Sequence, residues 1–483
     1  MDIFRSFISL LQSGLGNLGA YLAAHVLLCL LPAFFIAGAM TALIPKESVT
    51  RFLGRRRPKY ISYPAAVASG SILAVCSCTI VPLFAGIYKK GAGIGPAMTF
   101  LFFAPAANIL ALIYTGGIIG TDLAFARFFL SLTFGISIGL IMALIFRNED
   151  IAHDEAADAM FSGKGVMNRY SLTLLGVLVA LLLSGTLKIG MLTNTYATVT
   201  LPIQGLDKFQ EWLHWLVPFN PAKGEEGVSA QGAVLIGLLI LIGLTAWKGI
   251  ENILDGFNRW THISLTLVVA TLLVAAAGMV PHSGGLDILI TGKFFGVAIG
   301  LFIIIGLLKT KFKEDEISSF LWESWRFVKQ IFPLLVAGVF TVGVIRPLIR
   351  PEWIETVAGE NTLLGNLVGV FFGIFMYFPT LVEVPIAKMF LDLGMHKGPL
   401  LAYLMADPEL SLQSILITAS IIGRKRTFTY VGIVAVFSTI SGLIYGMWID
   451  GTSIGIIILF LAASIAVLSA GLWLSGRRNR KRI

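Results

Sequence analysis

The stretch Ala74-Val75-Cys76-Ser77-Cys78-Thr79-Ile80-Val81-Pro82-Leu83-Phe84 places two of the three cysteines of the chain in the middle of an apolar segment. Apolar residues flank it from about Ile61 to Tyr88, which is long enough to cross a bilayer. Ser and Cys followed by Pro in such a segment predict a broken helix rather than a continuous span. Positions i and i+2 of an α-helix point to nearly opposite faces. Cys76 and Cys78 can therefore act on one ligand only if the backbone unwinds between them.

The composition indicates a membrane protein with many helical spans. Of the 483 residues, 56% are hydrophobic and 13% are charged, whereas soluble proteins have about 25% charged residues. Apolar runs of about 18 or more residues recur along the whole chain, which is the length of a membrane-spanning helix. These runs are continuous, whereas a transmembrane β-barrel would need short alternating segments. We predict an all-α polytopic membrane protein.

Charge and motifs exclude several other classes of protein. The formal net charge of +9 lies in short basic clusters between the apolar segments, as positive-inside orientation produces, so we expect no nucleic-acid partner. Three cysteines do not make a disulfide framework. The first apolar run, near Leu18 to Ile44, is too long for a cleavable signal peptide. HExxH and P-loop motifs are absent and no GxSxG has its strand context, so we expect no enzyme, no metal centre and no cofactor.

The apolar segments divide the chain into three parts. We expect a first transmembrane repeat over residues 1–150, a middle transmembrane insert over 151–315 and a second repeat over 316–483. The insert begins with an acidic linker and contains a predicted interfacial helix around Gln210–Trp215, because Trp favours that depth. The whole chain is predicted to have about 11 spans plus two re-entrant broken-helix hairpins.

The two repeats are detected by internal sequence matches at one ungapped offset. Several Gly and Pro residues in the first part have an identical residue 303 positions later, in the last part. The matches are Gly70 with Gly373, Pro82 with Pro385, Gly91 with Gly394, Gly95-Pro96 with Gly398-Pro399, and Pro105 with Pro408. Leu and Ile matches count for little in a membrane protein, but Gly and Pro matches over about seventy residues indicate a duplication.

The charges indicate that the two repeats are inverted. Arg51–Lys59 and Lys89-Lys90 flank the first broken segment and Asp122 marks the next turn, whereas the second copy has Glu352–Glu360, Asp392 and Arg424–Arg426 at those places. Under the positive-inside rule, this reversal of sign predicts an inverted-topology repeat. Re-entrant broken segments keep most basic clusters and the basic tail inside. We therefore predict an inner-membrane, multi-pass protein with its N-terminus outside and its C-terminus in the cytoplasm.

Two broken segments at equivalent places in inverted halves are typical of a transport site near the membrane midplane. Cys76 and Cys78 are the first candidates to bind a solute there, because soft thiolates suit soft ligands such as Cu(I), Zn(II) or trivalent arsenic. The alternative is that both cysteines only pack, since Cys is a common buried apolar residue. Asn108 and the nearby Pro105, at a second break in the first copy, are further solute-binding candidates; Asn108 could instead only cap freed backbone groups.

Glu383 and Asp407 are the candidates for proton coupling. Glu383 lies in Phe378-Pro379-Thr380-Leu381-Val382-Glu383-Val384-Pro385, and a charge at a helix centre costs roughly 2.5–3.5 kcal/mol on insertion scales. The alternative is a structural ion pair with Lys388, five residues on. Asp407, beside Pro408, is a similar candidate, and capping of a helix by a loop-end Asp is its alternative.

The sequence resembles the ArsP-like, or YraQ-like, family of predicted permeases. The resemblance rests on Cys76-Ser77-Cys78 with Val81-Pro82, Lys89-Lys90-Gly91, Gly95-Pro96-Ala97 and Ala104-Pro105-Ala106-Ala107-Asn108. The family includes organoarsenical efflux permeases, so the resemblance implies that Cys76 and Cys78 bind a trivalent organoarsenical for export. The partners expected are a small-molecule or soft-ion substrate and the lipid bilayer. Transport of another metal ion or sulfur compound is the alternative, as is a membrane thiol oxidoreductase that uses the two cysteines as a redox pair.

Overall fold

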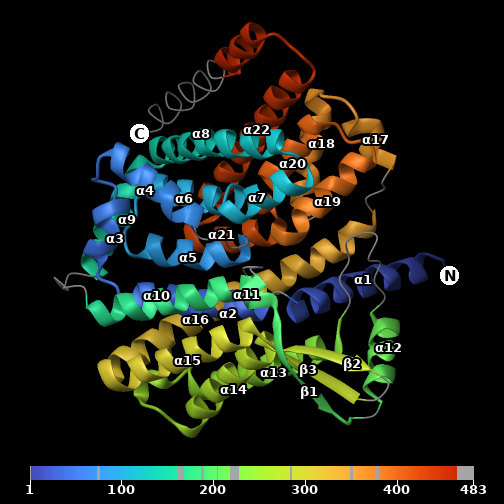
Figure 1. Cartoon of the computed structure of the whole chain (residues 1–483). Coiled ribbons are helices and arrows are strands. Elements are labelled where there is room, and N and C mark those ends of the chain that lie inside the picture. Colours follow the sequence, from blue (N-terminus) through green and yellow to red (C-terminus); the bar gives the residue numbers. More distant parts are fainter. Residues whose placement is uncertain are drawn as a thin grey trace.

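The computed structural model describes residues 2–24, 26–72, 77–160, 168–186, 190–203, 205–217, 228–282, 285–348, 352–375 and 380–464. Most of them are helical, and the long helices run side by side across the molecule (Figure 1). The first part of the chain contains α1 (Asp2–Ala24), α2 (Val26–Ala42), α3 (Lys46–Leu53), α4 (Lys59–Ile72), α5 (Ser77–Lys89), α6 (Ile94–Ala106), α7 (Ile109–Ile118), α8 (Thr121–Ile145) and α9 (Arg147–Met160).

The remaining elements follow in two groups. The middle part contains α10 (Arg169–Thr186), α11 (Gly190–Thr193), β1 (Thr195–Leu201), α12 (Leu206–Leu216), α13 (Ala230–Gly249), η2 (Ile253–Asp255), α14 (Arg259–Ala276), β2 (Gly278–His282), β3 (Gly285–Thr291) and α15 (Gly292–Lys311). The last part contains α16 (Glu314–Ile345), η3 (Arg346–Leu348), α17 (Glu352–Ala358), α18 (Leu363–Phe375), α19 (Thr380–Asp392), α20 (Lys397–Leu410), α21 (Leu412–Ile422) and α22 (Arg424–Ile449).

Several helices are long and apolar enough to cross a membrane. Among the described residues there are seven such helices, or up to nine when each of two bent helix pairs is counted as one span. One bent pair is α20 with α21, which meet at 45°. Four shorter apolar helices add to these, at Thr79–Lys89, Arg169–Gly185, Leu363–Phe375 and Ile454–Ser464. The fold is therefore that of a polytopic α-helical membrane protein.

A small antiparallel sheet, in the order β1-β3-β2, is the element that the all-α prediction lacks. Ile288 of β3 pairs with Val199 of β1 on one side and with Met279 of β2 on the other. The sequence of β1, Thr-Tyr-Ala-Thr-Val-Thr-Leu, is rich in the β-branched and aromatic residues that favour a pleated strand. Residues 286–291 of β3 begin a long apolar run, and periodicity alone cannot separate a short apolar strand from a helix there. The predicted interfacial helix at 210–215 lies within α12.

The first and last parts have matching helix bounds at the offset of 303. Helices α6, α7 and α8 start at Ile94, Ile109 and Thr121, and helices α20, α21 and α22 start at Lys397, Leu412 and Arg424. Helices α5 and α19 end at Lys89 and Asp392. Gly91 and Gly394, which end corresponding helices, adopt φ values of 87° and 92°, where glycine is favoured. The sequence matches therefore correspond to matching backbone.

The matching extends to the places where helices cross. A Cβ added at Gly139 of α8 would come within 2.5 Å of the Gly95 carbonyl oxygen of α6. A Cβ added at Gly442 of α22 would come within 2.6 Å of the Gly398 carbonyl oxygen of α20. The four glycines form two pairs at the offset of 303, so α6 and α8 approach each other as α20 and α22 do.

Helices α8 and α22, which correspond at this offset, pack antiparallel. Asp122 at the start of α8 accepts a hydrogen bond from the Tyr445 hydroxyl near the end of α22, at 2.9 Å. At the opposite end, the Lys425 ammonium lies 5.7 Å from the centre of the Phe146 ring. Midway, the rings of Phe134 and Phe437, themselves 303 residues apart, lie 4.7 Å apart. The two corresponding helices thus run in opposite directions about a central contact.

The helix pairs α4–α5 and α18–α19 each start and finish on one side of the molecule. Gly54, before α4, pairs with Ala92, after α5, in an isolated β-bridge. On the second pair, the His396 amide after α19 donates to the Ala358 carbonyl before α18, at 2.9 Å. Residues 73–76 and 376–379, which connect the helices of each pair, lie outside the described residues.

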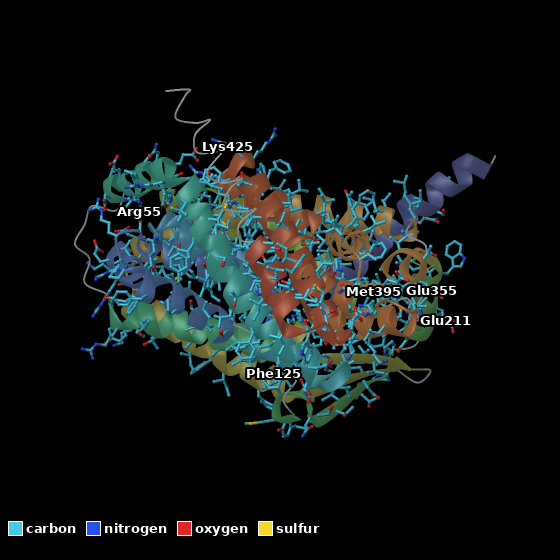
Figure 2. The ribbon with its side chains drawn as sticks, turned by 90° about the horizontal axis from the view of Figure 1, so that it is seen from above. Arg55, Phe125, Glu211, Glu355, Met395 and Lys425 are labelled. Carbon is cyan, nitrogen blue, oxygen red and sulfur yellow. The ribbon has the colours of Figure 1, made fainter. Side chains whose placement is uncertain are left out.

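Charged residues gather at two opposite sides of the molecule. Arg55 and Lys425 lie at one side and Glu355 at the other (Figure 2). At the first side, acidic residues of α9 bind both sequence parts: Asp150 lies 3.6 Å from Arg55, and Glu149 accepts a hydrogen bond from Arg426 at 2.8 Å. At the other side, Lys397 donates to Asp122 at 2.8 Å. Ion pairs therefore join the first and last parts at both sides.

A polar contact beyond the end of α13 predicts a pH dependence of stability. Lys329 and Trp325 of α16 donate to Glu251 at 2.6 Å each, and the hydrogen bond from Lys329 lowers the pKa of this carboxyl below its ordinary 4.5. The contact then stabilises the fold above the unfolded pKa and is lost as pH falls through the folded pKa. Glu251→Gln should cost up to about 1 kcal/mol at pH 7 and nothing at the acidic end of a thermal-unfolding series, because half-exposed pairs contribute little. A cost that is independent of pH would contradict this.

Candidate functional site

Asn108 lies at the break between α6 and α7 and caps the backbone on both sides of it. Asn108 is buried, its Oδ1 accepts a hydrogen bond from the Ala111 amide at 2.9 Å, and its Nδ2 donates to the Ala104 carbonyl at 3.0 Å. It therefore satisfies one freed backbone group on each side of the break, as its capping alternative predicted. Pro105, in the last turn of α6, is buried beside it.

A buried arginine holds this break to the last part of the chain. Arg127 of α8 has 0% of its side chain exposed, and Glu383 of α19 has 1%. The Arg127 Nη2 donates to Glu383 Oε1 at 2.9 Å, Nε donates to the Ala106 carbonyl at 2.6 Å, and Nη1 donates to the Thr115 hydroxyl of α7 at 3.2 Å. One guanidinium thus joins α6, α7 and α19. It neutralises the carboxylate and binds the last carbonyl of a broken helix.

The partner of Glu383 is therefore Arg127, and the alternative of an ion pair with Lys388 is wrong. Residues at i and i+5 lie on different faces of a helix, and Lys388 instead pairs with Asp392, one turn further on and exposed. Sequence reasoning missed Arg127. The available signal was a basic residue inside the apolar segment 123–146, the counterpart of the acidic Glu383.

Asp407 lies inside α20, so the alternative that it caps a helix is wrong. The residue that precedes α21 is Ser411, whose hydroxyl donates to Ser414 at 2.8 Å. Asp407 is fully buried, and a Cβ added at Gly373 of α18 would come within 2.8 Å of its amide nitrogen. Two residues on, Glu409 is also buried and accepts a hydrogen bond from the Tyr430 hydroxyl at 2.6 Å. The break in the last part thus begins with two buried carboxyls.

Of the two candidate cysteines, the described residues include only Cys78. Cys76 lies outside the described residues, and Cys78 lies in the first turn of α5, where only its backbone is described. From Thr79 onward, α5 is buried and packs against α2, α6 and α21. The corresponding α19 packs against α7. Each of these two helices therefore contacts the second half of a broken helix from the other part of the chain.

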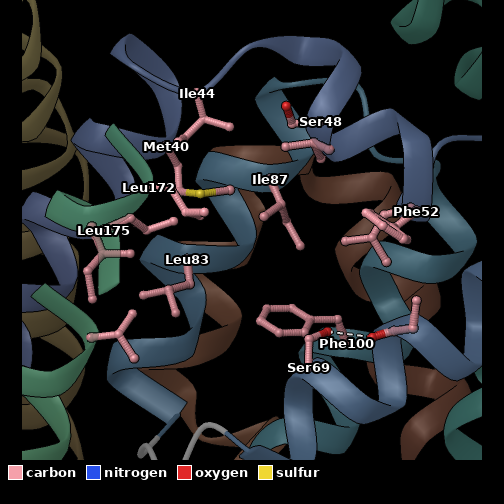
Figure 3. A pocket seen from close by; sticks show the side chains of 15 residues that line it. Met40, Ile44, Ser48, Phe52, Ser69, Leu83, Ile87, Phe100, Leu172 and Leu175 are labelled. Atoms are coloured by element: carbon pink, nitrogen blue, oxygen red, sulfur yellow. Dashed lines mark hydrogen bonds between the residues drawn. The ribbon is translucent and has the colours of Figure 1, made fainter. Parts of the chain in front are cut away.

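An apolar cavity of about 430 Å³ adjoins α4 and α5, the helices on either side of residues 73–76 (Figure 3). Met40 of α2, Leu83 and Ile87 of α5 and Phe100 of α6 point into it. Its few polar groups include the Ser69 hydroxyl, which donates to the Ala65 carbonyl at 2.7 Å. Within the part of the chain that the structure describes, no group of three or more His, Cys, Asp or Glu side chains could hold a metal ion.

The long apolar helices, with interrupted helices and a buried charge pair between them, are those of a polytopic membrane protein. Residues 13–447 match the family described as "Predicted permease", and the chain belongs to this ArsP-like family. The UPF0718 protein MJ0584 of Methanocaldococcus jannaschii is similar, with 32% identity over 450 residues that cover 92% of this chain and 99% of that protein. No solved structure matches the chain.

Proposed function

We propose that the protein is a secondary transporter that exports a soft, thiol-reactive solute of the trivalent organoarsenical class from the cytoplasm. The observation that carries the transport part of this proposal is the Arg127–Glu383 pair, which lies where a broken helix of the first part meets a helix of the last part. A buried charge pair at such a place is typical of a transport pathway. The class of solute comes from the two cysteines.

The proposal includes an inverted-topology repeat, with segments 1–150 and 316–483 as its copies and 151–315 as an insert between them. The matching helix bounds and glycine crossings support the duplication, and the antiparallel packing of α8 with α22 supports the inversion. The return of α4–α5 and of α18–α19 to their starting sides supports two re-entrant hairpins. Alternating access then consists of rocking one copy against the other.

Each candidate residue takes one role in this mechanism. Cys76 and Cys78 bind the soft solute as thiolates at the first hairpin, and Asn108 and Pro105 form the adjoining wall at the α6–α7 break. Glu383 and Asp407 couple transport to protons. Protonation of Glu383 would release Arg127 and loosen the contact between the two copies, because the charge attraction between the side chains is lost.

The location follows from charge. We propose an inner-membrane protein whose N-terminus is outside and whose C-terminus is cytoplasmic. The side that carries Arg55 and Lys425 would then face the cytoplasm, in agreement with the positive-inside rule (Figure 2).

Substitution of the cysteines tests the substrate. Cells that express Cys76→Ser or Cys78→Ser should lose the resistance to trivalent methylarsenite that the wild-type protein confers, because a hydroxyl is a poor ligand for a soft centre. Cys29→Ser in α2 is the matched control and should keep full resistance. Wild-type resistance in both test variants, at equal protein level, would show that the thiols do not bind the solute. Trapping of a mixed disulfide with a partner protein would instead favour a thiol oxidoreductase.

A further inference from the structure

Another buried carboxyl, that of Glu409, lies at the place in the last part of the chain that corresponds to the Arg127 contact in the proposed repeat. Glu409, in the last turn of α20, is 5% exposed. Its Oε2 accepts a hydrogen bond from the Tyr430 hydroxyl of α22 at 2.6 Å. Its Oε1 has no hydrogen-bond partner among the described residues. A fully ionised carboxylate would leave this oxygen buried without compensation.

No described cation is available to compensate a charge on Glu409. Helix α20 packs against α6, α18 and α21, which carry no titratable side chain, and against α8, α19 and α22. The titratable groups on those three helices and on α20 itself are Asp122, Arg127, Glu383, Lys388, Asp392, Lys397, Tyr403, Asp407, Arg424, Lys425, Arg426, Tyr430 and Tyr445.

The basic groups in this set bind elsewhere or are exposed. Arg127 binds Glu383, Lys388 binds Asp392, and Lys397 binds Asp122. Lys425 and Arg426 bind Glu149, and Arg424 is exposed at the start of α22. Because an unpaired buried charge is expensive at membrane depth, Glu409 is neutral in this conformation and carries a proton on its carboxyl group.

The Glu409–Tyr430 pair corresponds to the Arg127 contact of the first copy. Adding 303 to Arg127 and to Ala106, whose carbonyl it binds, gives Tyr430 and Glu409. In the first copy the contact joins the last turn of α6 to α8, and in the second copy it joins the last turn of α20 to α22. In the first copy the pair is a fixed cation and a carbonyl, which does not titrate. In the second copy it is a phenol and a carboxyl, which can gain and lose a proton without breaking an ion pair.

We propose that Glu409, hydrogen-bonded by Tyr430, is a further group of this permease that binds and releases a coupling proton. The proton adds to a carboxylate oxygen when the site opens to the acidic side and leaves as H⁺ when it opens to the other side. Glu409 takes up its proton without breaking an ion pair, whereas protonation of Glu383 would release Arg127. This inference rests on the proposed transport function but assigns the proton to a residue outside its candidates.

Infrared spectroscopy of the purified full-length protein tests the protonation state without any substrate. The wild-type protein at neutral pH should show the C=O stretching band of a buried, protonated carboxyl, and Glu409→Gln should lose this band. Tyr430→Phe should shift it to higher frequency, because the hydrogen bond to the carbonyl oxygen is removed. Asp392→Asn, at the exposed end of α19, is the control and should keep the band at its wild-type frequency. A Glu409→Gln spectrum that retains the band, or a Tyr430→Phe spectrum without the shift, overturns the inference.

Transport in everted vesicles then separates proton coupling from solute movement. With methylarsenite as the probe, Glu409→Gln should lose the accumulation that a pH gradient drives and keep the exchange of internal for external solute. Loss of exchange as well would overturn the inference, because Glu409 would then be needed for binding or movement. If the wild-type protein itself neither accumulates nor exchanges methylarsenite while the infrared assignment holds, the proposed function fails and the proton site stands.

Discussion

Replacing Arg127 with leucine should lower the free energy of unfolding by about 3–5 kcal/mol, because it leaves the Glu383 carboxylate buried and unpaired. The side chains are 0% and 1% exposed, so water cannot take the place of the missing guanidinium. The same substitution also removes the hydrogen bonds to the Ala106 carbonyl and the Thr115 hydroxyl. Denaturant unfolding of the purified protein in detergent measures the loss.

Two further variants make this prediction specific. The double variant Arg127→Leu/Glu383→Leu should be more stable than Arg127→Leu alone, because it removes the uncompensated charge together with its partner. Lys388→Leu breaks the exposed pair with Asp392 on the same α19 and should cost about 1 kcal/mol or less. Equal losses for Arg127→Leu and Lys388→Leu would mean that water reaches the Arg127 site.

The second large effect concerns the glycine crossing of α20 and α22. Gly442→Ala should cost about 1–3 kcal/mol, the usual range for overpacking a tight contact. The added methyl group would lie 2.0 Å from Asn366 Oδ1 and 2.6 Å from the Gly398 carbonyl oxygen. The amide side chain can rotate away, but the carbonyl is part of the α20 backbone, so the two helices must separate.

The same helix supplies the control for this substitution. Gly432 of α22 has nothing within 4 Å of an added Cβ. Gly432→Ala should therefore stabilise the protein by about 0.4–1 kcal/mol, because alanine lowers the entropy of the unfolded chain. Thermal unfolding of both variants measures effects of opposite sign. A neutral Gly442→Ala would contradict the close crossing, and Gly139→Ala should repeat the result at the corresponding place in α8.

The sequence could predict features that depend on residues close together in the chain. Long apolar runs determined the membrane class, and Gly and Pro at one offset predicted the helix bounds that α5–α8 and α19–α22 share. Asn108 and Glu383 were identifiable because an amide three residues after a proline, or a carboxyl inside an apolar run, is unusual in a span. The sheet was missed because its strands β2 and β3 continue apolar runs that also suit a helix.

Which groups bind one another was decided by the tertiary structure alone. Arg127 and Glu383 are 256 residues apart, and the sequence offered the nearer Lys388 instead. Glu409 and Tyr430 became a pair because α20 and α22 cross at Gly398 and Gly442. The physical reason is that periodicity and breaks depend on neighbouring residues, whereas a buried charge takes the partner that the packing of distant helices brings to it.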